Sequence, residues 1–169
     1  MKHFILIILC AFVGIQSLQA QIPQKKRDFE FWVGEWNVYK YGTDTLVGKS
    51  SIQSIIDGHA ILEKYTAIGS AYEGTSLNKY NTDNGKWEQY YVDNTGLTLH
   101  LTGQFSKNKM VLENKVTKGN EVTRNRITWE SVDQDQVRQI WSQKKHKTNQ
   151  NEPFNWQVIF DGIYKSRSM

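Results

Sequence analysis

The chain has 169 residues, 21 lysines and arginines against 17 acids, a formal net charge of +4 and one cysteine. This length fits one ordinary domain, and a single cysteine excludes a disulfide-stapled scaffold or a cysteine-rich metal site. The basic residues are scattered apart from short runs at residues 25–27 and 144–147, which we interpret as solvated, so nucleic acid is not an expected partner.

The first twenty residues have the pattern of a secretory signal peptide. Lys2 lies in a short basic start, residues 4–13 form an apolar run too short to span a bilayer, and Ala20 is a small residue suited to cleavage. We therefore expect residues 1–20 to be removed and the protein to be exported, either periplasmic or secreted, without stable membrane insertion. Removal also takes away Cys10 and lowers the net charge to +3. An uncleaved anchor or a core helix is the alternative.

The next residues predict a short lead and then a barrel domain spanning residues 28–169. Residues 21–27 are polar and contain a proline, so we expect a flexible lead. Asp28 can cap a short helical turn, which Gly34 ends, and Trp36 then opens the first strand. A helical turn followed by Gly-x-Trp is similar to the start of a lipocalin-type barrel, in which the tryptophan closes one end.

From there, segments rich in Val, Ile, Thr, Tyr and Trp alternate with turn sequences. The turn sequences fall at residues 42–44, 57–58, 69–70, 83–85, 94–96, 106–108, 118–120 and 133–135. This spacing, with no helical period between the turns, predicts an all-β protein of about ten strands. Closure removes the exposed edges of such a sheet, so we predict a single antiparallel up-and-down β-barrel.

Residues 87–93 carry different chemistry on their two faces, and residues 75–81 pair with them in a predicted hairpin. Because strand side chains alternate, Trp87, Gln89 and Tyr91 share one face with Asp93. That face mixes aromatic and polar groups, and a buried amide or carboxylate is costly unless it is hydrogen-bonded. The face therefore either points to water or lines a cavity that can bind something.

Several short motifs together resemble a widespread bacterial family of lipocalin-like proteins whose function is uncharacterised. The motifs are Asp28-Phe29-Glu30-Phe31-Trp32-Val33-Gly34-Glu35-Trp36-Asn37-Val38, Gly58-x-Ala60-x-Leu62-Glu63, Gly74-x-Ser76-Leu77-Asn78-x-Tyr80, Trp87-x-Gln89 with Asp93, Arg126-Ile127-Thr128-Trp129, Val137-Arg138-Gln139-x-Trp141 and Phe160-Asp161-Gly162-x-Tyr164. They cover nearly the whole mature chain. The resemblance implies a lipocalin-like, calycin-type β-barrel, and it implies no reaction because the family has no assigned activity.

The motif residues fall on alternating positions of each strand, and this alternation predicts which side chains line the lumen. The residues that we expect to bind a ligand are Glu63, Tyr65, Asn78, Tyr80, Trp87, Gln89, Tyr91, Asp93, Arg126, Gln139 and Trp141. The same alternation places Leu99, Trp156 and Phe160 on the inner face. Aromatic rings would form the walls, and the polar groups would orient a small, partly polar organic molecule. We expect a monomer or a weak homodimer.

Three other interpretations stay open. The lumen could be filled, with Arg126 paired to Glu63 or Asp93. Glu63 and Asp93 could act as general acid and base, although we assign no catalytic residue. Outer patches rather than the lumen could bind a partner. No cofactor or metal is predicted, because the histidines lack metal-ligand spacing and no histidine follows Lys147 to hold a haem.

Overall fold

The structure is a computed structural model, and it describes residues 24–148 and 155–167. The predicted signal peptide lies outside the described residues, as do residues 21–23 of the predicted lead. The described part of the lead contains a 3-10 turn, η1 (Gln24–Lys26). Cleavage of the signal peptide and flexibility of the lead therefore stay predictions.

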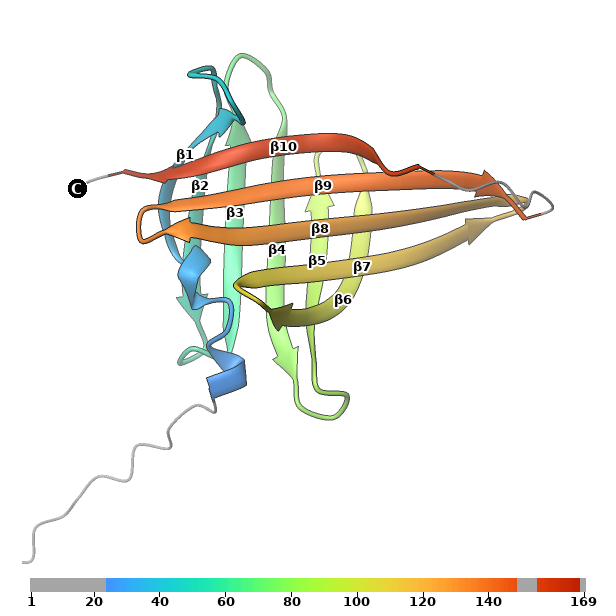
Figure 1. Cartoon of the computed structure of the whole chain (residues 1–169), viewed down its shortest axis with the longest axis horizontal. Helices are drawn as coiled ribbons and strands as arrows, with labels where there is room; N and C mark the ends of the chain where they lie inside the picture. Colours follow the sequence, from blue (N-terminus) through green and yellow to red (C-terminus); the bar gives the residue numbers. More distant parts are fainter. Residues whose placement is uncertain (1–23, 149–154, 168–169) are drawn as a thin grey trace, which may run out of the picture.

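Ten antiparallel strands close into a single up-and-down barrel (Figure 1). The strands are β1 (Gly34–Lys40), β2 (Leu46–Ile55), β3 (Ala60–Ala67), β4 (Glu73–Asn81), β5 (Lys86–Asp93), β6 (Thr98–Ser106), β7 (Lys109–Lys118), β8 (Glu121–Asp133), β9 (Gln136–Lys147) and β10 (Gln157–Ser166), and a second 3-10 turn, η2 (Glu30–Trp32), precedes them. Each strand pairs with its neighbours in sequence, and β1 pairs with β10. The predicted fold class and the short N-terminal helical turn are confirmed. Such a barrel is compatible with a lipocalin-like architecture.

The turn between β4 and β5 shows why the predicted turn sequences end strands. Asn81 Oδ1 accepts a hydrogen bond from Asp83 N at 2.9 Å, and Asn81 O accepts one from Gly85 N at 2.9 Å. Gly85 has a φ of +67°, a conformation that glycine adopts without steric cost. The hairpin predicted over residues 75–93 is confirmed.

Aromatic side chains close one end of the barrel. Phe29, just before η2, stacks on Trp32 with ring centroids 5.0 Å apart and meets Trp129 edge-on at 5.0 Å. It also meets Trp87 edge-on at 5.6 Å, and Trp36 Nε1 donates a hydrogen bond to Trp32 O at 2.9 Å. All five side chains are buried. We call this cluster the aromatic plug.

The Gly-x-Trp motif positions the plug. Gly34 has a φ of +152°, and a Cβ there would lie 3.3 Å from the Trp36 ring. Glycine therefore allows both the backbone bend and the close approach of the ring. The predicted helix cap is wrong, because the N-cap position of η2 is Phe29 and no side chain caps it. The turn begins too late for the carboxylate of Asp28 to serve that role.

The strand directions leave a second end opposite the plug. Because β1 begins at the plug and the strands are antiparallel, the ends of β1, β3 and β5 meet the starts of β2, β4 and β6 at that second end. In Figure 1, β7 to β10 run across the direction of β1 to β6 and extend to one side. Among the described residues, no helix has the length and apolar character needed to cross a membrane.

Candidate functional site

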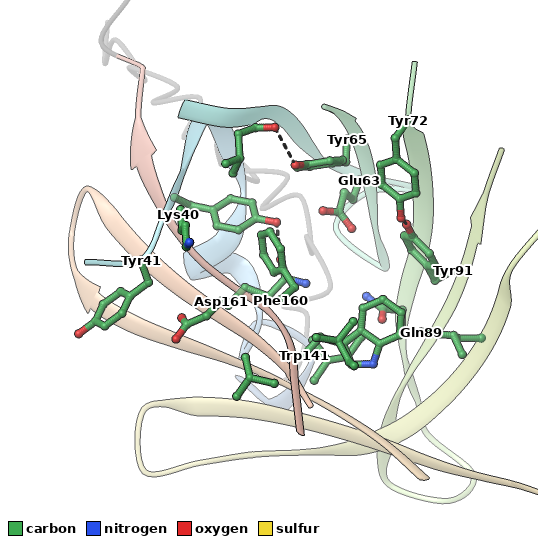
Figure 2. A pocket seen from close by; sticks show the side chains of 17 residues that line it. Lys40, Tyr41, Glu63, Tyr65, Tyr72, Gln89, Tyr91, Trp141, Phe160 and Asp161 are labelled. Atoms are coloured by element: carbon green, nitrogen blue, oxygen red, sulfur yellow. Dashed lines mark hydrogen bonds between the residues drawn. The ribbon is translucent and has the colours of Figure 1, made fainter. Parts of the chain in front are cut away.

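The barrel end opposite the aromatic plug holds a cavity of about 730 Å³ (Figure 2). Small-molecule pockets commonly measure roughly 300–1,000 Å³. The cavity is lined by Lys40, Tyr41, Val47, Glu63, Tyr65, Tyr72, Gln89, Tyr91, Leu99, Ile127, Gln139, Trp141, Val158, Ile159, Phe160, Asp161 and Tyr164. The barrel is thus filled at one end and hollow at the other.

Six of the residues predicted to bind a ligand line this cavity. They are Glu63, Tyr65, Gln89, Tyr91, Gln139 and Trp141. Tyr80 and Trp87 lie at the plug end instead, with ring centroids 6.1 Å apart, and Trp87 Nε1 donates a hydrogen bond to Lys25 O at 3.1 Å. Alternation along a strand predicts the face of a side chain but not its depth in the barrel. The prediction that Tyr80 and Trp87 face inward therefore holds, but both lie at the plug end and not at the cavity.

Arg126 lies on the outer face of β8, which corrects the prediction that it lines the lumen. Its neighbours Asn125 and Ile127 are buried, as is Trp129, so the odd-numbered positions of this stretch face inward. Arg126 forms an ion pair with Glu113 on β7, and its guanidinium lies 4.4 Å from the centroid of the Trp156 ring. Trp156 is therefore also on the outer face. The prediction failed because it followed the polar residues of the motif, whereas the core buries the large apolar ones.

Asp93 holds the turn between β5 and β6. Its Oδ1 accepts hydrogen bonds from Thr95 N at 2.9 Å, Thr95 Oγ1 at 2.7 Å and Leu97 N at 3.1 Å. Its Oδ2 accepts one from Tyr72 OH at 3.1 Å. Burial raises the pKa of Asp93, but these hydrogen bonds outweigh burial and lower the pKa below its ordinary value. The carboxylate is committed to the turn and is not a second acid or base beside Glu63.

Glu63 is the centre of a buried hydrogen-bond network at the bottom of the cavity. Its Oε2 accepts a hydrogen bond from Ser76 Oγ at 2.8 Å, and its Oε1 accepts one from Ser50 Oγ at 3.4 Å. Ser76 Oγ in turn accepts from Asn78 Nδ2 at 3.0 Å and from Gln89 Nε2 at 3.4 Å. Because Ser76 receives these amide hydrogens, its own hydrogen points to Glu63. We call these five residues the polar floor.

The backbone of β3 fixes which way the two amides of the polar floor face. Asn78 Nδ2 donates a hydrogen bond to Ile61 O at 3.2 Å, so Asn78 Oδ1 faces Gln89 and accepts from its Nε2 at 2.9 Å. This orientation leaves Gln89 Oε1 buried without a hydrogen-bond partner. Buried polar atoms are nearly always paired, so the polar floor contains an acceptor that the protein itself does not satisfy.

The charge of Glu63 changes near neutral pH. Burial raises the pKa of Glu63 to about 7, and the hydrogen bonds from Ser76 and Ser50 lower it only in part. None of the ion pairs found among the described residues involves Glu63. The carboxylate therefore has hydrogen bonds but no ion-pair partner in the described part of the chain.

Tyrosines surround Glu63, and two of them donate their hydroxyl hydrogens to nearby carbonyl oxygens. Tyr65 OH donates to Val47 O at 3.2 Å, the dashed line at the top of Figure 2. Tyr164 OH donates to Gln139 Oε1. Burial raises the pKa of Tyr65 to about 12 and also raises the pKa of Tyr164, and in both cases the negative charge of Glu63 adds to the effect. Both hydroxyls are neutral at physiological pH.

The hydroxyl groups of Tyr72 and Tyr91 are in contact (Figure 2). Tyr72 OH also donates to Asp93, so the three side chains form a hydrogen-bonded chain. Because the single hydroxyl hydrogen of Tyr72 goes to the Asp93 carboxylate, the hydrogen in the Tyr91–Tyr72 contact comes from Tyr91. Burial raises the pKa of both tyrosines. Both hydroxyl hydrogens are thus already used in hydrogen bonds. The two tyrosines present only ring surface and oxygen lone pairs to the cavity.

Three of the cavity rings occupy space that a side chain would otherwise fill. A Cβ on Gly48 would lie 2.5 Å from Tyr65 Cζ, one on Gly74 would lie 2.9 Å from Tyr91 Cζ, and one on Gly162 would lie 2.5 Å from Phe160 Cζ. Such distances are too short for any real side chain. The glycines therefore let these rings approach the barrel wall, and this arrangement keeps the lumen wide.

We expect Gly74→Ala to narrow the cavity and to destabilise the protein. The new methyl group must push the Tyr91 ring toward the lumen and away from Tyr72, because it would otherwise overlap the ring. Overpacking of this kind costs about 1–3 kcal/mol in the free energy of unfolding. Denaturant unfolding measures the cost. Lys79→Ala, on an exposed position of the same strand, is the control and should change little; equal stability of the two variants would contradict the role given to Gly74.

Sequence reasoning does not predict several residues of the site. Five of them line the cavity, Lys40, Tyr41, Val47, Ile159 and Asp161, and three others illustrate the reasons. Tyr72 lies between β3 and β4, where strand alternation does not apply, and only its position beside a Gly-Ser turn marks it. Ile127 was missed because β8 was read with the wrong face inward. Ser50 is directly opposite Tyr65 in the β2–β3 register. The alternation of buried residues along β2 could have identified Ser50, since it lies two positions before Ile52.

A comparison with protein-family models and with curated proteins finds no match to the chain. The resemblance to the lipocalin-like family therefore stays a prediction. In the part of the chain that the structure describes, no group of three or more His, Cys, Asp or Glu residues is placed to hold a metal ion. The expected lack of a cofactor also stays a prediction.

Proposed function

We propose that this protein is an exported lipocalin-like barrel, related to the uncharacterised bacterial family, that binds a small, partly polar organic molecule in its lumen. The observation that carries the proposal is the cavity of about 730 Å³ above a polar floor that contains a charged group and an unpaired acceptor. Aromatic walls with a few convergent polar groups are the usual composition of a small-molecule site.

The energetics of the polar floor support ligand binding over a purely structural role. Each unpaired buried polar group costs about 1–3 kcal/mol. Such groups also occur in the aromatic plug, at Trp32 Nε1 and Trp129 Nε1, so what distinguishes the polar floor is that its unpaired acceptor and its carboxyl group lie beside a cavity. The Glu63 carboxyl group is buried without an ion-pair partner among the described residues, and Gln89 Oε1 is buried without a hydrogen-bond donor. Groups of this kind gather at functional sites, where a ligand completes them.

Export and a monomeric or weakly dimeric state complete the proposal. Export is inferred from the signal-peptide pattern of residues 1–20. The monomeric state is supported by the closed sheet, because every described strand has a partner on both sides and leaves no edge for another chain.

We expect protein purified from its native host to carry a non-covalent small molecule, detected as an added mass by native mass spectrometry. Leu99→Trp should abolish the added mass, because Leu99 lines the cavity and a tryptophan there fills it. Val92→Trp is the matched control, since Val92 is 45% exposed on the neighbouring strand β5. An added mass that survives Leu99→Trp, or its absence from the native protein, would count against lumen binding.

The second candidate is an enzyme in which Glu63 alone is the acid or base. A buried carboxyl group with a pKa of about 7 favours this role, because it can hold or release a proton at neutral pH. The experiment compares the bound molecule recovered from the wild type and from Glu63→Gln. Recovery of a product from the wild type and of its precursor from the variant would establish catalysis; the same molecule from both would remove it.

A further inference from the structure

We propose that the molecule bound in this lumen is an organic amine, held as a cation with its ammonium group against the polar floor and its apolar part against the aromatic wall. This inference rests on the proposed lumen-binding function and specifies the class of ligand. Its basis is an excess of hydrogen-bond acceptors, a carboxylate without a counter-charge, and a set of ring faces that favour a cation.

When Glu63 is ionised, above its pKa of about 7, the polar floor can accept hydrogen bonds but has few hydrogens left to donate. Ser76 gives its hydrogen to Glu63, and Asn78 Nδ2 donates to Ile61 O and to Ser76 Oγ. Gln89 Nε2 donates to Asn78 Oδ1. The atoms without a full set of partners are oxygens, with Gln89 Oε1 buried and unpaired. A ligand that completes this floor must bring hydrogens to it, as an ammonium group does.

The tyrosine hydroxyls of the cavity wall show the same excess of hydrogen-bond acceptors over free donors. The hydroxyls of Tyr65 and Tyr164 donate to Val47 O and Gln139 Oε1, and Tyr91 and Tyr72 donate along a chain to Asp93. Each hydroxyl oxygen keeps lone pairs. Among the described lining residues, the donors left are the Gln139 amide nitrogen and, at the open end, the Tyr41 hydroxyl and the Lys40 ammonium group. The deep part of the cavity is therefore rich in hydrogen-bond acceptors, and it carries negative charge when Glu63 is ionised.

The charges around the cavity also favour a cationic ligand. Glu63 is the one charged group of the polar floor, whereas Lys40 and Asp161 belong to the open end. Asp161 is already neutralised by Arg138, whose Nε and Nη2 donate to its two carboxylate oxygens at 3.0 and 2.7 Å. Glu63 has no such partner among the described ion pairs. A buried carboxylate is costly without a counter-ion, and a cationic ligand would supply one.

The wall is suited to the rest of such a molecule. The rings of Tyr65, Tyr72, Tyr91, Trp141 and Phe160 line the cavity. Trp141 Nε1 already donates to Asn125 Oδ1 at 3.0 Å, so Trp141 offers the cavity its ring and no free N–H. Ring faces attract cations and pack against apolar groups. A carboxylate or phosphate ligand would instead meet the negative charge of Glu63.

The test uses three probes with the same indole ring and different terminal groups: tryptamine, tryptophol and indole-3-propionate. Isothermal titration calorimetry at pH 7.5 should show that tryptamine binds about 10- to 100-fold more tightly than tryptophol, the range expected for a charge-assisted hydrogen bond. Indole-3-propionate should bind most weakly. In Glu63→Gln the ratio of the tryptamine and tryptophol affinities should fall to near one.

Two controls separate the ligand class from the existence of a lumen site. Glu113→Gln, on the outer face of β7, should keep the wild-type affinity ratio, and Leu99→Trp should abolish binding of tryptamine and tryptophol. Equal affinities for tryptamine and tryptophol in the wild type, or a ratio that survives Glu63→Gln, would overturn the amine proposal while leaving lumen binding in place. Binding of none of the three probes would also overturn it, and the added mass in native protein would then decide lumen binding separately.

Discussion

Glu63→Gln should raise the free energy of unfolding by about 3 kcal/mol at pH 8 and change it little at pH 4. The effect follows from burial of the Glu63 carboxyl group, which raises its pKa from 4.5 to about 7. The folded protein therefore holds the Glu63 proton more tightly than the unfolded chain does. An uncharged amide of the same shape removes this difference between the two states.

The sign of the pH dependence is set by which state binds more protons. Between pH 4.5 and about 7 the folded protein keeps the Glu63 proton and the unfolded chain loses it. The contribution of Glu63 to stability is thus fully present below pH 4.5 and is lost as the pH rises to about 7, beyond which the penalty is constant. The tyrosines that face Glu63 have raised pKa values and stay neutral throughout this range.

The hydrogen bonds of the polar floor allow this replacement. The amide oxygen of the new side chain can accept from Ser76, and its nitrogen can donate to Ser50 Oγ, which then donates to Lys64 O, now 3.5 Å away. Denaturant unfolding of wild type and variant at several pH values from 4 to 8 measures the difference between them. Glu113→Gln, at a half-exposed outer position, should show no such pH-dependent difference. A difference in the free energy of unfolding between wild type and Glu63→Gln that is the same at every pH would contradict the raised pKa of Glu63.

The same group that destabilises the empty barrel is the one that the proposed amine would stabilise. A cation at Glu63 favours the ionised carboxylate, so ligand binding would offset the cost that the empty lumen carries at neutral pH. A structural role gives no reason to place a carboxylate at this depth, because a glutamine would satisfy the same serines. The polar floor is therefore best understood as part of a binding site.

The sequence is sufficient to predict the barrel because local patterns determine it. Turn residues such as those at 83–85 end each strand, and alternation in segments such as 87–93 assigns two faces. Alternation also predicts correctly that Gln89 and Tyr91 face the lumen. These properties depend on neighbouring residues only, so they can be read without knowing the partners of a strand.

The details of the site depend on contacts between distant residues, and these the sequence does not reveal. Trp87 and Gln89 share a face, yet Phe29 covers Trp87 whereas Gln89 reaches the cavity. The unpaired Gln89 Oε1 results from a chain of hydrogen bonds across three strands. None of these follows from the pattern within one strand.

The largest loss of stability should come from Phe29→Ala, which we expect to lower the free energy of unfolding by about 3–5 kcal/mol. Phe29 has no exposed surface, and its ring lies within 5.6 Å of four other aromatic rings, counted by centroids. Truncation leaves a cavity among Trp32, Trp87 and Trp129, three side chains too large and too constrained to close it. It also releases η2 from the barrel end that the plug seals.

Phe31→Ala provides a matched comparison, because the same chemical change is made two residues away. Phe31 is only partly buried and has two ring neighbours, Phe29 at 5.6 Å and Phe105 at 5.8 Å. Its loss should therefore cost clearly less than that of Phe29, as measured by urea unfolding of both variants. Since the plug and the cavity occupy opposite ends, Phe29→Ala should retain the tryptamine preference at temperatures where it is folded. Equal destabilisation by the two variants would mean that η2 contributes general hydrophobic cover and not a specific seal centred on Phe29.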